Sequence, residues 1–210
     1  MSDPGRLSRR DFLKLRRRSA PIDARSSIVS WMIQPAQETP RARSHSLPIM
    51  RPPGAVAEPQ FLDRCTRCGD CLTACPHDAI VNAPERSRRA EDTPMIDPSI
   101  APCYMCDETP CIPACETGAL LPTAPLKMAD AQVKRPDCLA HMGQACSVCV
   151  GHCPVPGAIS LVDAKPVIDA DRCTGCGVCH FVCPAPNKAI MILPLRDRPK
   201  APPFRPTHDG

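Results

Sequence analysis

The sequence predicts an α+β fold of short strands and short helices that is held together by its cysteines more than by a large apolar core. Two observations indicate this fold. The chain of 210 residues contains 16 Cys and 28 Pro, but only one Trp, one Tyr and four Phe. Because large aromatic side chains usually supply much of the buried area of a core, the apolar core should be thin. The cysteines, in turn, recur in regular groups of four.

Composition divides the chain into three segments. Residues 1–57 are basic at first and then rich in Pro, Ser, Arg and Ala without sustained periodicity, so we expect a flexible arm. Residues 58–193 contain every cysteine and should form the folded domain. Residues 194–210 contain five prolines and should form a Pro-rich tail without helix or central strand. No stretch of about twenty apolar residues is present, so we expect no membrane span.

The domain contains a fourfold repeat of cysteine runs. In chain order, runs 1 to 4 are Cys65, Cys68, Cys71 and Cys75; Cys103, Cys106, Cys111 and Cys115; Cys138, Cys146, Cys149 and Cys153; and Cys173, Cys176, Cys179 and Cys183. The stretches "DAIV", "TGALL", "GAISLV" and "KAIMIL" follow the runs, and "TPMID" and "KPVID" precede runs 2 and 4. Short apolar stretches beside turn residues are typical of strands. The predicted unit is strand, cysteine loop, short helix, turn and strand.

The spacing of the runs predicts iron–sulfur chemistry. Runs 1 and 4, "CTRCGDCLTACP" and "CTGCGVCHFVCP", both fit C-x2-C-x2-C-x3-C-P. In this pattern the first three thiolates hold one cluster and the fourth ligates the other cluster of a pair. Runs 2 and 3 are variants with the same number of cysteines. The sequence therefore predicts four [4Fe–4S] clusters, with all sixteen cysteines as iron ligands.

The same cysteines also partly fit two other kinds of metal site. Cys176, Cys179 and His180 also fit the C-x-x-C-H pattern of c-type haem, but haem would remove two ligands from a complete run, and no second axial ligand is indicated. Structural zinc usually takes two C-x2-C pairs. These cysteines instead come in runs of four, and runs 1 and 4 each begin with three closely spaced cysteines. No catalytic set of Ser, His and Asp accompanies the runs, so we expect no enzyme. The basic arm lacks interleaved aromatic residues, so nucleic-acid binding is not expected.

These motifs together resemble the NapG/MauM-type ferredoxins, and alternatively the NapF-type ferredoxins, of periplasmic nitrate reductase systems. "RPPGAVAEPQF", "CYMCDETPCIPAC" and "AIMILPL" are NapG-like, while "CTRCGDCLTACP" is NapF-like. The chain departs from the pattern at Glu116, where the Pro after run 2 is missing. The resemblance implies a bacterial ferredoxin-like fold of two fused or nested two-cluster modules with flexible tails.

The resemblance also implies nested ligand sets, in which run 1 pairs with run 4 and run 2 pairs with run 3. Cluster one would take Cys65, Cys68, Cys71 and Cys183, and cluster two would take Cys173, Cys176, Cys179 and Cys75. Cluster three would take Cys103, Cys106, Cys111 and Cys153, and cluster four would take Cys138, Cys146, Cys149 and Cys115.

The function implied by the resemblance is electron transfer toward a molybdenum nitrate reductase or a similar oxidoreductase. The chain would be an electron carrier or accessory subunit. Its partners would be redox proteins, either the catalytic subunit of the reductase or a membrane subunit that oxidises quinol. The alternative is a NapF-like cytoplasmic maturation partner that binds the reductase before export.

The N-terminus bears on localisation. "SRRDFLK", residues 8–14, matches the twin-arginine export motif, which is used by proteins that are exported already folded. A working signal also needs a following apolar stretch, but five charged residues occupy residues 15–25 and "IVSWMI" is too short. We therefore expect a cytoplasmic protein whose arm docks on a partner or on anionic lipid. Periplasmic export is the alternative, and cell fractionation of an Arg9→Lys/Arg10→Lys variant distinguishes the two.

Overall fold

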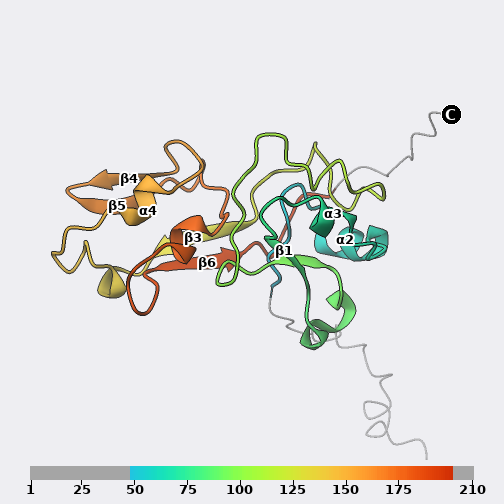
Figure 1. Cartoon of the computed structure of the whole chain (residues 1–210), viewed down its shortest axis with the longest axis horizontal. Helices are drawn as coiled ribbons and strands as arrows, with labels where there is room; N and C mark the ends of the chain where they lie inside the picture. Colours follow the sequence, from blue (N-terminus) through green and yellow to red (C-terminus); the bar gives the residue numbers. More distant parts are fainter. Residues whose placement is uncertain (1–47, 201–210) are drawn as a thin grey trace, which may run out of the picture. The chain divides into compact units, whose positions relative to one another are not determined.

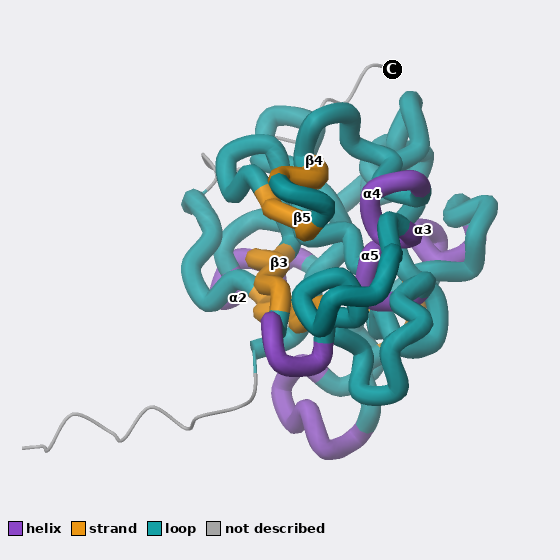
Figure 2. Tube along the Cα trace, turned by 90° about the vertical axis from the view of Figure 1, so that its left-hand side faces the viewer, coloured by secondary structure: helices purple, strands orange, loops and turns teal. Residues whose placement is uncertain are grey.

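The computed structural model describes residues 48–200, and most of this range is loop and turn (Figures 1 and 2). Its helices are α2 (Glu58–Arg64), α3 (Asp70–Thr73), α4 (Val148–Gly151) and α5 (Val178–Phe181), with 3-10 segments η2 (Glu85–Ala90) and η3 (Arg135–Asp137). Its strands are β1 (Ile80–Asn82), β2 (Pro94–Ile96), β3 (Ala129–Val133), β4 (Ile159–Val162), β5 (Lys165–Ile168) and β6 (Ile190–Pro194). The predicted mixture of short helices and short strands is confirmed.

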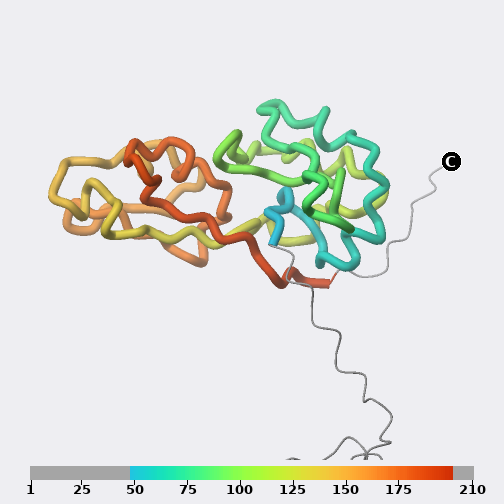
Figure 3. The backbone as a smooth tube through the Cα atoms, turned by 90° about the horizontal axis from the view of Figure 1, so that it is seen from below, coloured from blue at the N-terminus to red at the C-terminus, as the bar shows by residue number. Residues whose placement is uncertain are grey.

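The strands of the described range pair into three antiparallel two-stranded sheets. β1 pairs with β2, β4 pairs with β5, and β3 pairs with β6. The β1–β2 sheet lies between runs 1 and 2 in the sequence, and the β4–β5 sheet lies between runs 3 and 4. β3 precedes run 3 and β6 follows run 4, and Figure 3 shows the two strands side by side. An antiparallel sheet therefore joins run 1 to run 2, and another joins run 3 to run 4.

Most of the predicted strands are present. Strands β1 and β2 fall on "DAIV" (extended to Asn82) and on "TPMID". Strands β4 and β5 fall on "GAISLV" and "KPVID", and β6 falls on "KAIMIL" (extended to Pro194). The stretch "TGALL" forms only one isolated bridge, between Leu120 and Ala55. β3 was not predicted, because its sequence "ADAQV" contains a single β-branched residue and no turn signal that marks a strand.

Packed residues begin before residue 58, within the segment 1–57 that the sequence analysis assigned to the arm. Met50 and Val56 are buried in the same core cluster as Phe61. Prolines and arginines suggested an arm, yet their neighbours pack against α2 and β2. In the segment assigned to the Pro-rich tail, the N–H of Leu195 donates to the carbonyl of Met128 (3.2 Å). Residues 1–47, including the twin-arginine motif, and residues 201–210 lie outside the described part of the chain.

Arg51 is the charged residue that ties this first segment to the core. Its side chain is fully buried and forms an ion pair with Glu58 at the start of α2. It donates to the hydroxyl of Thr93 and to the carbonyl of Pro94, at 2.7 Å each. Its guanidinium carbon lies 4.3 Å from the centre of the Phe61 ring. One side chain thus links residue 51, α2 and β2, and a buried cation is stable here because it is paired and hydrogen-bonded.

Replacing Arg51 with Met should lower the free energy of unfolding by about 3 kcal/mol, because the Glu58 carboxylate and the Pro94 carbonyl lose their charged donor. The control is Lys127→Met, which removes a half-exposed ion pair with Asp130 and should cost less than about 1 kcal/mol. Chemical denaturation of both variants under anaerobic conditions measures the difference. Equal losses in the two variants would contradict the role assigned to Arg51.

Candidate metal centres

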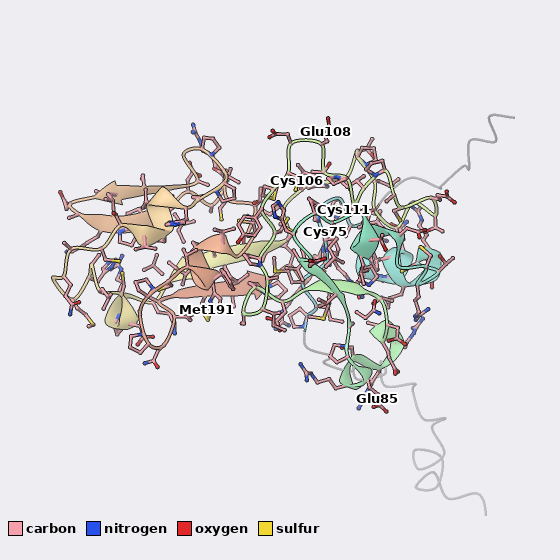
Figure 4. The ribbon with its side chains drawn as sticks, in the orientation of Figure 1. Cys75, Glu85, Cys106, Glu108, Cys111 and Met191 are labelled. Carbon is pink, nitrogen blue, oxygen red and sulfur yellow. The ribbon has the colours of Figure 1, made fainter. Side chains whose placement is uncertain are left out.

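The cysteines of runs 1 and 2 meet at the β1–β2 side of the domain. One recess is lined by Cys103, Cys106 and Cys111 of run 2 and by Cys75, the fourth cysteine of run 1. Figure 4 labels three of these residues, and they lie close together although they come from different runs. We call this group of four site 2, after the run that provides its first three cysteines.

The remaining cysteines of the same two runs form site 1. Burial and then the neighbouring thiol of Cys115 raise the pKa of Cys71 to about 12, and Cys65 and Cys68 act in the same sense. Cys115 is the fourth cysteine of run 2, so it stands with the first three cysteines of run 1. Cys71 is buried, whereas Cys68 is exposed. Site 1 therefore reaches the surface at Cys68.

Runs 3 and 4 repeat this exchange. Site 4 is a recess lined by Cys173, Cys176 and Cys179 of run 4 together with Cys153 of run 3. Site 3 contains the first three cysteines of run 3 and the last cysteine of run 4; its members are Cys138, Cys146, Cys149 and Cys183. Burial raises the pKa of Cys149 to about 11, with the other three thiols of site 3 adding to the shift.

The grouping of the cysteines in the structure differs from the nested ligand sets that the resemblance implied. Cys75 lies with run 2 instead of run 4, and Cys183 lies with run 3 instead of run 1. Likewise, Cys115 lies with run 1 and Cys153 lies with run 4. The physical reason is the antiparallel pairing of β1 with β2 and of β4 with β5. Because a hairpin returns the chain to its starting point, each run folds back on its immediate neighbour.

The electrostatics of the sites suit a polycation that binds thiolates. The pKa values of Cys71, Cys103 and Cys179 are raised to about 12, with burial as the largest cause and neighbouring thiols as a further one. Several thiolates cannot share such a site without a compensating positive charge. Iron held by the four cysteines of a site would supply that charge, and its binding would release the thiol protons.

Hydrogen-bond donors around the sulfurs also fit an iron–sulfur group. The N–H of Leu120 donates to Cys115 Sγ (3.4 Å), and the N–H of Ala189 donates to Cys183 Sγ (3.3 Å). Backbone N–H groups of this kind stabilise the ionised form of sulfur. Thr174 lines the recess of site 4, and its buried hydroxyl has no geometrically well-formed hydrogen bond within residues 48–200. A donor in that position fits a sulfur-rich occupant.

Both ring nitrogens of His180 contact other residues of the protein, so the histidine is not set aside as a haem ligand. It lies on α5 and is half-buried. Its Nδ1 donates to the carbonyl of Ile190 (2.7 Å), and its Nε2 lies 3.5 Å from the hydroxyl of Ser99. Cys176 and Cys179, which would attach the haem, both line site 4. The geometry therefore agrees with the interpretation of these residues as part of an iron–sulfur site.

Comparison with known proteins defines the class of the protein. Residues 64–119 match the family described as "4Fe-4S dicluster domain", and residues 164–185 match the family described as "4Fe-4S binding domain". The first match spans runs 1 and 2, the two runs that exchange cysteines in the structure. The chain is therefore a ferredoxin-type protein with 4Fe–4S binding domains, a class of electron carriers. No solved structure matches it.

Curated relatives define the family more closely. The methylamine utilization ferredoxin-type protein MauM of Methylophilus methylotrophus is 41% identical over 160 residues, covering 70% of this chain and 71% of the relative. MauM of Methylorubrum extorquens is 32% identical over 208 residues, covering 92% of both chains. The ferredoxin-type protein NapG of Escherichia coli is 36% identical over 177 residues, covering 76% of this chain and 75% of the relative. The chain belongs to the MauM/NapG family of ferredoxin-type proteins.

Proposed function

We propose that this protein binds four [4Fe–4S] clusters, one at each site, and carries electrons between protein partners. The observation that supports this most strongly is the gathering of sixteen cysteines into four groups of four, with each group drawn from two neighbouring runs. Two matched 4Fe–4S families support the same class of cofactor at fewer sites. The proposed ligand sets are sites 1 to 4 as grouped in the structure.

The residues around the sites have a holding and insulating role. When bound, each cluster supplies one-electron exchange at sulfur-ligated iron. The cysteines fix its position, and the backbone donors of Leu120 and Ala189 stabilise the sulfurs. Apolar side chains such as Ile80, Ile96 and Ile159 line sites 2 and 4 and limit the access of water. This arrangement suits an electron carrier or accessory subunit.

The relatives suggest the kind of partner. MauM relatives are named for methylamine utilization, and NapG relatives share their ferredoxin-type description. We therefore infer that this protein exchanges electrons with redox proteins of a respiratory system. The electrons would pass toward a molybdenum nitrate reductase or a similar oxidoreductase. Within residues 48–200, no helix is long and apolar enough to cross a membrane.

Anaerobic reconstitution tests the cluster content. Four cubanes, each held by four thiolates, should give about sixteen iron atoms and about sixteen acid-labile sulfides per chain. Iron and sulfide analysis of the purified protein measures both quantities. Zinc without sulfide, or iron and sulfide sufficient for only two clusters, would overturn the proposal of four.

Replacement of the fourth cysteines tests which run completes which site. Cys183→Ala should disturb the cluster held by Cys138, Cys146 and Cys149, because Cys183 lies with them. Cys115→Ala is the matched variant and should instead disturb the cluster held by run 1. EPR spectra of the reduced variants, with iron analysis, report the change. Loss of the run 1 cluster on replacing Cys183 would favour the nested sets.

A further inference from the structure

The two halves of the domain, runs 1 and 2 on one side and runs 3 and 4 on the other, meet at a specific contact. The N–H of Cys103, the first cysteine of run 2, donates to the carbonyl of Cys176 in run 4 (3.1 Å). Cys176 is buried in the same core cluster as Cys71 and Cys111 of the other half. Two cysteine residues and one hydrogen bond thus connect site 2 to site 4.

Further contacts fix run 4 in this position. The N–H of Met128 donates to the carbonyl of Thr174 (2.8 Å), one residue before β3 begins. Met128 is fully buried, and Val178 of α5 is 2% exposed. The loop of run 4 is therefore enclosed by the segment that leads into run 2 and by the start of β3.

Two glycines make this close approach possible. Gly175 has φ +70°, and a Cβ there would lie 2.1 Å from the carbonyl oxygen of Ala129. Gly177 has φ +89°, and a Cβ there would lie 2.5 Å from Cβ of Pro98. Contacts this short exclude any larger side chain unless the backbone moves. Positive φ is also a conformation that residues with a Cβ adopt at a cost.

Run 1 shows that the cysteine motif itself does not require such packing. Gly69 corresponds to Gly177 and has nearly the same φ, +86°, yet a Cβ there would meet nothing within 4 Å. At the position of Gly175, run 1 has Arg67, which accepts φ 61° and extends an exposed side chain. The two runs share a backbone conformation, but only run 4 is pressed against the other half of the domain.

We propose that Gly175 and Gly177 are positioning residues that hold run 4 against the start of β3 and against the segment before run 2, so that the contact between Cys103 and Cys176 joins the two halves of the electron carrier. This inference rests on the proposed function of the four sites. Packing then arranges the sites in one row, in the order site 1, site 2, site 4 and site 3. Cys71 packs near Cys111, Cys103 contacts Cys176, and Cys179 packs with Cys149.

The test compares Gly177→Ala with Gly69→Ala in the reconstituted full chain. Both variants place a Cβ at positive φ, but only the first places it against Pro98. Hydrogen–deuterium exchange at the amides of Cys103 and Met128 reports the contact, and iron analysis of the same samples reports cluster content. In Gly177→Ala these amides should exchange about tenfold to a hundredfold faster, the range expected from overpacking. Gly69→Ala should leave their exchange unchanged.

A compensating variant keeps the test decisive if Gly177→Ala folds poorly. Gly177→Ala/Pro98→Gly removes the side chain that the new methyl group would meet, so it should restore both slow exchange and iron content. The EPR spectrum of the fully reduced protein should lose magnetic interaction between the halves in Gly177→Ala and regain it in the double variant. Equal exchange in Gly177→Ala and Gly69→Ala, or no recovery in the double variant, would overturn the proposal. Iron below four clusters in the unmodified protein would count against the proposed function instead.

Discussion

The exchange of fourth cysteines between neighbouring runs is the constraint on which the rest of the domain depends. Cys75 and Cys115 each leave their own run to complete the group formed by the other, so neither site 1 nor site 2 is complete within one run. The β1–β2 and β4–β5 hairpins make this exchange possible because they return the chain to the preceding run. The strand pairing brings the cysteines of each site together, and the sites in turn hold the paired segments in place. Such mutual support suits a domain that has few buried aromatic residues.

The spacing of the cysteines was sufficient to predict four runs of four candidate iron ligands, because each run is a local pattern in the sequence. It was not sufficient to predict which runs lie together. It could not specify the partner of Cys183, because that depends on which run lies nearby in space. The nested sets came from the resemblance, and the structure groups the cysteines differently. Runs 1 and 4 differ at one informative position, where run 1 has Arg67 and run 4 has Gly175. The missing side chain at Gly175 is the feature of the sequence that reflects the close packing of run 4.

Fold prediction succeeded and failed for similar reasons. Strands rich in β-branched residues, such as β4 and β6, were predicted from local sequence. β3 was missed because it is a strand only through its pairing with β6, which is distant in the sequence. Val133 pairs with Ile190, 57 residues later. Residues 50–57 were assigned to the arm because Pro and Arg usually mark exposed chain. Arg51 is instead buried, and its charge is balanced by Glu58 and by the hydrogen bonds to Thr93 and Pro94.

The most direct test of the account is to locate the iron atoms and their cysteine ligands. An anaerobic crystal structure of the reconstituted protein, with anomalous scattering measured at the iron absorption edge, would do this in one experiment. The account predicts four separate iron clusters, with Cys115 bound to the cluster at the run 1 site and Cys183 bound to the cluster at the run 3 site. A cluster at the run 1 site bound by Cys183, or fewer than four clusters, would contradict it.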